Sequence, residues 1–263
     1  MPINQIYPNP TVKQVIFQIR FPNLFSMENN IGDIQYKIME EFPQSALIFK
    51  RQLLFLDTGE EGLFKGVQDE FEHKRDNKNA EQLGGKKIWQ FKSNKNFQLN
   101  ITADSLDITS QHHKTYQKDG ADKFRDIIEF VLTKFFEVIK IPIINRVGLR
   151  YIDECPIPKK NNTTFKSYYN SVFPIDRFNL ADAKEMVYRT VIKKGKNFLI
   201  YIESLSQIEN QYKLILDFDG FAENIKSKDV LTTTDILHTI IEDEFVNTIR
   251  EPVIKFMKQK KVG

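Results

Sequence analysis

The sequence predicts an α+β fold, built as one wide, curved antiparallel sheet with long helices on its convex face. Segments of alternating apolar and polar residues outnumber the helical segments, and each half of the chain ends in a long amphipathic helix. The chain also repeats itself, because residues 95–101 and 196–202 both begin Lys-Asn-Phe and continue as apolar strands. These observations favour two similar halves joined in one body, with the concave face of the sheet left free for a partner.

The two halves are expected at residues 10–140 and 143–260 of a single domain that spans residues 1–263. Each half would contain a leading strand, a short helix or irregular segment, an antiparallel meander and a long helix. The leading strands, aligned on Arg20 and Arg150, lie farther apart than the Lys-Asn-Phe copies. An insertion in the first half explains the difference, and the glycine-rich, charged residues 57–87 are the predicted insertion.

Apolar side chains at alternate positions predict the strands of the first half. These strands lie at 12–21, 47–56, 88–92, 96–103 and 105–110, with one more expected around 63–67. Apolar residues at steps of three and four predict two helices. Residues 29–42 form the first helix, which Pro43 ends, and residues 122–140 form the second, which Pro142 follows.

The second half begins with a strand at 144–153. It continues into an irregular, aromatic-rich segment at 155–183, which we expect to pack across the sheet. Three antiparallel strands follow at 185–193, 197–204 and 211–219. Helical periodicity then predicts a long helix from Thr234 to Lys258, capped by one of the threonines at 232–234 and kinked at Pro252.

Composition limits the classes of function. The 38 basic and 35 acidic residues give a formal net charge of +3, unlike the strongly basic surface of a typical nucleic-acid-binding protein. Cys155 is the only cysteine, which excludes an intramolecular disulfide and a cysteine-based metal site.

The chain has no signal-peptide pattern and no apolar run of membrane-spanning length, so we expect a cytoplasmic protein without membrane contact. Nucleotide-binding and serine-hydrolase motifs are also absent, and we expect no cofactor.

Two strand sequences carry a resemblance to known proteins. Val15–Phe21 (VIFQIRF) and Arg146–Asp153 (RVGLRYID) resemble the patterns Val-x-Phe-x-Ile-Arg-Phe and Arg-x-Gly-Leu-Arg-Tyr-Ile-Asn. These patterns are typical of a sporadically distributed, largely uncharacterised family of bacterial proteins, whose length of about 250 residues is that of one domain. The resemblance implies no established activity. Some relatives look like accessory proteins of CRISPR effector nucleases such as Cas9, and the patchy distribution of the family is similar to that of defence genes.

The carboxylates of Asp217 and Asp219 lie on one face of a predicted strand end. Two carboxylates at this spacing can hold Mg²⁺ for phosphoryl chemistry, with Glu203 as a further candidate ligand. The alternative interpretation is a turn before Gly220, in which the two aspartates have only a local role.

Basic residues form two further candidate sites. Arg20 and Arg150 hold equivalent places in the leading strands and can clamp phosphate or carboxylate together, or each can pair with a neighbour such as Asp153 or Glu154. Lysines gather at the corresponding hairpins of both halves, where they bind nucleic acid or a partner, or only protect sheet edges. They are Lys86, Lys87, Lys92, Lys95, Lys193, Lys194 and Lys196.

The adjacent His112 and His113 are expected to form a solvent-exposed pair, because neighbouring residues of a strand point to opposite faces.

The absence of a catalytic pattern favours a non-enzymatic accessory protein, expected to be a homodimer that assists a larger protein or nucleoprotein machine. The resemblance implies a CRISPR-type effector as that machine. A metal-dependent nuclease or phosphodiesterase, and a protein that binds nucleic acid directly, are the alternatives.

Overall fold

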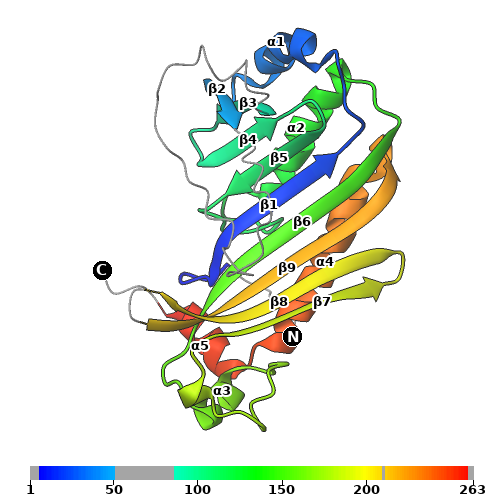
Figure 1. The fold of residues 1–263 in the computed structure, drawn as a ribbon. Coiled ribbons are helices and arrows are strands. Elements are labelled where there is room, and N and C mark those ends of the chain that lie inside the picture. The colour runs from blue at the N-terminus through cyan, green and yellow to red at the C-terminus, as the bar shows by residue number, and fades with distance from the viewer. Residues whose placement is uncertain (1–5, 51–85, 209–210, 260–263) are drawn as a thin grey trace.

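The computed structural model describes residues 6–50, 86–208 and 211–259 (Figure 1). These residues form nine strands and five α-helices, which confirms the α+β class. The strands are β1 (Val12–Arg20), β2 (Gln44–Lys50), β3 (Lys86–Lys92), β4 (Phe97–Ile101), β5 (Ser105–Ser110), β6 (Ile143–Pro156), β7 (Met186–Lys194), β8 (Asn197–Ile208) and β9 (Gln211–Lys226). The helices are α1 (Met27–Ile38), α2 (Phe124–Val138), α3 (Asn162–Tyr168), α4 (Val230–Thr248) and α5 (Glu251–Lys258).

All nine strands belong to one antiparallel sheet, in the order β2-β3-β4-β5-β1-β6-β9-β8-β7. The two leading strands, β1 and β6, are neighbours at its centre, and each also pairs with the last strand of its own meander, β5 or β9. The two parts of the chain therefore share one continuous hydrogen-bonded sheet.

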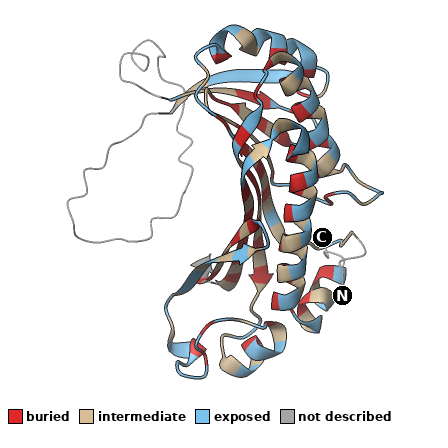
Figure 2. Cartoon of the chain, turned by 90° about the vertical axis from the view of Figure 1, so that its right-hand side faces the viewer, coloured by how far each residue is buried: buried red, intermediate tan, exposed pale blue. Residues whose placement is uncertain are grey.

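Alternation along the strands separates a core face from an open face. Val15, Phe17 and Ile19 of β1 are fully buried and lie opposite Tyr151, Leu149 and Val147 of β6. This core face packs against α2 and α4, which lie behind the sheet in Figure 1. Figure 2 shows the sheet with the long helices along one side. The side chains at the positions between these buried residues point to the opposite side of the sheet, which we call the open face.

Gly220 of β9 allows α4 to approach the core face closely. A Cβ atom at this position would lie 3.3 Å from the Cδ1 atom of Ile241 and 3.5 Å from the Cβ atom of Leu237, both in α4. The expected turn at Gly220 is wrong, because β9 continues through this residue to Lys226. Asp217 and Asp219 consequently lie inside a long strand.

The Lys-Asn-Phe copies do not have equivalent side-chain orientations. Phe97 and Leu99 of β4 point into the core, whereas Phe198 of β8 lies on the open face, with its ring stacked on Phe221 at 5.1 Å. In β8 the buried neighbour is Leu199. The side chains of a strand alternate with a period of two, so the sequence match is one residue out of step with the sheet.

The predicted helix at 234–258 is two helices. Thr234 lies inside α4, where its hydroxyl donates to the Val230 carbonyl, and so the predicted threonine cap is wrong. The backbone is extended at Ile249, and the amide of Arg250 donates to the Tyr168 carbonyl. Pro252 stands in the first turn of α5, where its missing amide proton costs no hydrogen bond.

The segment expected to be irregular contains α3 and a 3₁₀ turn at Leu180–Asp182. α3 packs against α5 at one end of the sheet and does not cross it (Figure 1). Most of the predicted insertion at 57–87, with its expected strand at 63–67, lies outside the described residues, as does the end of the predicted strand at 47–56.

Candidate functional site

Two arginine–aspartate pairs occupy the centre of the open face. The Arg150 Nε and Nη2 atoms donate to the two Asp217 carboxylate oxygens at 2.8 and 2.5 Å. Arg146 Nη2 donates to both oxygens of Asp219 at 2.8 Å. The arginines belong to β6 and the aspartates to β9, so both pairs cross between adjacent strands.

Gly148 makes room for the Arg146 side chain. A Cβ atom on this glycine would lie 2.3 Å from an Arg146 guanidinium nitrogen, so the side chain lies flat across the Gly148 backbone. The guanidinium carbon is also 4.8 Å from the ring centroid of Phe221, within the range of a cation–π contact. Burial nevertheless raises the pKa of Asp219, although the neighbouring arginines act in the opposite direction.

The geometry does not favour the metal site expected at Asp217 and Asp219. Arginines already occupy their carboxylates, and Glu203 is fully buried on the opposite, core face of the sheet. The Val172 amide and the Tyr201 hydroxyl donate to Glu203, whose pKa is raised by burial. Within the described ranges no group of three or more His, Cys, Asp or Glu side chains is placed to hold a metal ion.

Arg20 and Arg150 project onto the same open face, but Arg20 lies directly opposite Arg146. Arg150 pairs with an acidic residue, but this residue is Asp217 of the adjacent strand and not Asp153 or Glu154, the neighbours named as examples. Arg20 is exposed and donates to the Gln18 side-chain oxygen at 2.7 Å. Among the described residues it has no carboxylate partner, and it is therefore the available charge at the centre of this face.

The lysines predicted as one basic surface are separated. Four of them form ion pairs, namely Lys86 with Asp104, Lys87 with Glu28, Lys95 with Glu41 and Lys194 with Glu244. Lys92, Lys193 and Lys196 are exposed. The β3–β4 and β7–β8 hairpins that carry these lysines lie toward opposite edges of the nine-stranded sheet (Figure 1). They therefore do not form one continuous nucleic-acid groove.

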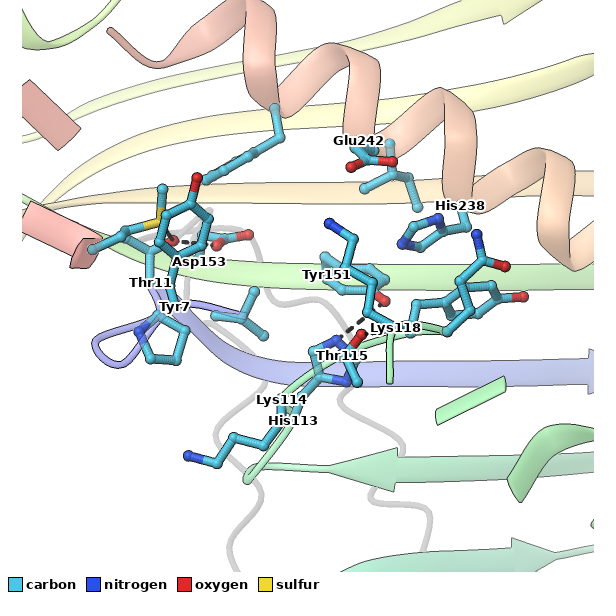
Figure 3. A pocket seen from close by; sticks show the side chains of 17 residues that line it. Tyr7, Thr11, His113, Lys114, Thr115, Lys118, Tyr151, Asp153, His238 and Glu242 are labelled. Atoms are coloured by element: carbon cyan, nitrogen blue, oxygen red, sulfur yellow. Dashed lines mark hydrogen bonds between the residues drawn. The ribbon is translucent and has the colours of Figure 1, made fainter. Parts of the chain in front are cut away.

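A pocket of about 140 Å³ lies on the core side of the sheet (Figure 3). Its walls come from the start of β1, the connection at 113–118, β6, α4 and α5. Tyr151, Ile241 and Phe245 supply aromatic and apolar surface, and the exposed residues Lys114 and Gln117 also line it. No sequence pattern points to this pocket, because its residues come from segments far apart in the chain.

Asp153 is the most deeply buried ionisable group of the pocket, with 2% of its surface exposed. The Thr11 hydroxyl donates to its Oδ1 atom at 2.7 Å. Burial raises the pKa of Asp153 from 3.8 to about 7, which the Thr11 hydrogen bond only partly opposes. This carboxyl group therefore changes protonation near neutral pH.

Two histidines line the same pocket. His113 contacts the Phe124 and Tyr151 rings edge-on, and His238 stacks on Tyr116 at 4.1 Å between ring centroids. Burial lowers the pKa of His113 to about 3 and that of His238 to about 4, so both imidazoles are neutral at pH 7. The prediction that His112 and His113 are both exposed is therefore wrong for His113, although His112 is exposed.

The fold and these two surfaces define an α+β protein with a sheet face that no described helix covers and a small pocket on the core side of the sheet. None of the described helices is long and apolar enough to cross a lipid bilayer. Comparison of the chain with protein-family models, curated proteins and solved structures finds no match.

Proposed function

We propose that the protein is a non-enzymatic interaction protein whose open face docks on an acidic surface of a larger effector protein. The observation that supports this proposal most directly is Arg20, an exposed arginine without a described carboxylate partner. It lies directly across the central strand pair from Arg146. Asp219 already neutralises Arg146, so Arg20 remains to pair with a carboxylate from a partner.

The surroundings of Arg20 favour a protein partner over a nucleic acid. Ile16 and Ile152 are half-buried on the same face, and the aspartates of β9 already neutralise Arg146 and Arg150. Arginine beside apolar residues is typical of the centre of a protein–protein interface. A strand of nucleic acid would require more unpaired positive charge than this face carries.

The resemblance is to a family in which some relatives look like CRISPR accessory proteins, and it supports the identity of the proposed partner, a CRISPR effector nuclease such as Cas9 or another defence machine in the cytoplasm. The two halves of the chain, in this proposal, are copies of one ancestral unit that together form a curved docking surface. The nuclease alternative is not proposed, because Glu203 lies on the opposite face from Asp217 and Asp219.

Replacing Arg20 by glutamate is expected to abolish capture of the effector, because the change places a negative charge against an acidic surface. Tagged protein is expressed in its host and purified at physiological salt, and co-purifying proteins are identified by mass spectrometry with and without nuclease treatment. The wild-type protein should retain one large protein at stoichiometric yield in both samples, and R20E should retain less than a tenth of it.

Arg177 provides the control, since it is also exposed but lies in the 155–183 segment. R177E should capture the effector as well as the wild-type protein does. Capture that disappears with nuclease, recovery of nucleic acid alone, or equal capture by R20E would each refute docking through the open face.

A homodimer is proposed through β7, which is an edge strand of the sheet. Val187 and Val191 on this strand are 38% and 49% exposed, and an edge strand with exposed apolar side chains can pair with another strand. Two copies of β7 related by a two-fold axis extend the sheet across both subunits.

Substituting both Val187 and Val191 by lysine is expected to convert the dimer to a monomer, because symmetry places the added charges against each other. Sedimentation velocity across micromolar concentrations measures the mass. The matched control is Val172→Lys, at a valine that is 47% exposed outside the sheet, and this variant should remain dimeric. A monomeric wild-type protein, or a dimeric double variant, would contradict this interface.

A further inference from the structure

The pocket between α4 and β6 holds two opposite charges that are not paired with each other. Asp153 stands on its floor, and Lys118 reaches into it from the connection before α2 (Figure 3). Within the described residues, neither side chain has an oppositely charged group within the 4.0 Å of an ion pair. Lys118 is close enough to His238 to help lower its pKa.

An ionised Asp153 is unfavourable in the empty pocket, because its carboxylate is buried without a cation beside it. A ligand that carries one cation and one anion satisfies both groups at the same time. We propose that this pocket binds a small zwitterion of the α-amino acid class, with its ammonium group on Asp153 and its carboxylate on Lys118.

The rest of the pocket fits this ligand class. The volume of about 140 Å³ is close to that of a protein cavity that accepts one benzene ring, so it suits an amino acid with a small side chain. Ile241, Phe245 and Tyr151 supply apolar and aromatic surface for that side chain. His113 and His238 are neutral and add no net charge, while Lys114 and Glu242 are the other charged side chains of the lining.

The test is isothermal titration calorimetry of the full chain at pH 8 with L-alanine, L-valine and L-proline. Two analogues of valine separate the charges: isobutylamine lacks the carboxylate, and 3-methylbutanoate lacks the ammonium group. At least one amino acid should bind with a dissociation constant in the millimolar range or below. For valine, each analogue should bind at least tenfold more weakly.

Asp153→Asn and Lys118→Met should each weaken amino acid binding by at least tenfold. Lys255→Met, at an exposed lysine of α5 outside the pocket, should leave it unchanged. Lys118 lies in a connection and not in a helix or strand, so Lys118→Met is expected to fold. This variant still tests the proposal if Asp153→Asn does not fold. The proposal is overturned if none of the three amino acids binds, if valine binds and either of its analogues binds as tightly, or if Lys118→Met leaves amino acid binding unchanged.

Discussion

Replacing Arg150 by alanine is expected to lower the free energy of unfolding by about 3 kcal/mol, because it leaves the Asp217 carboxylate buried without its cation. Asp217 is only 7% exposed, and both of its carboxylate oxygens accept hydrogen bonds from Arg150. The Arg150 side chain itself is 41% exposed, which keeps the expected loss at the lower end of the range for buried pairs. Urea unfolding of the wild-type and variant proteins measures the difference.

A second substitution identifies the cause of this loss. Adding Asp217→Asn to the Arg150→Ala variant removes the uncompensated charge, so the double variant should recover most of the lost stability. The control is Lys166→Ala, which breaks the exposed ion pair with Asp176 and should change stability by less than about 0.5 kcal/mol. If the Asp217→Asn change gives no recovery, the loss arises from packing of the arginine stem and not from the charge.

Asp153→Asn is expected to change the pH dependence of stability. The folded-state pKa of Asp153 is about 7, above its unfolded value of 3.8, so the folded protein keeps a proton that the unfolded chain releases. The Asp153 contribution is therefore fully present below pH 4 and is lost as the pH rises to about 7. Asparagine cannot ionise and can still accept the Thr11 hydrogen bond. The variant should equal the wild type at pH 4 and exceed its stability at pH 8 by up to about 4 kcal/mol.

The comparison must be made between the two proteins at each pH, because the pocket histidines have the opposite effect. Their pKa values are lowered, so His113 and His238 destabilise the folded protein as the pH falls below about 6.5. This contribution is common to both proteins and cancels in the difference. A difference that stays constant from pH 4 to pH 8 would show that Asp153 is ionised in the folded state at pH 4.

The periodicity of apolar residues located most helices and strands of the described chain, but it did not show which side of each strand faces the core. The predicted strand at 105–110 matches β5, and the predicted helix at 122–140 contains α2. The sequence match predicts equivalent orientations for Phe97 and Phe198, and this prediction was wrong. Shifting a strand by one residue turns every side chain to the other face of the sheet without changing the sequence of the strand. The same alternation separates Glu203 from Asp217 and Asp219, although all three were compatible with one site on spacing alone.

The sequence by itself determined the α+β class, the apolar surfaces of α2 and α4, and the absence of a known catalytic motif, since these depend on local pattern. Only the tertiary structure decided that Arg150 binds Asp217, that Arg20 faces Arg146, and that Lys118 and Asp153 share a pocket. These partners come from different strands and connections, and their meeting depends on strand order and register. Strand pairing joins residues that are far apart in the chain. The local pattern of one sequence does not specify the register of the paired strands, and therefore does not specify which side chains meet.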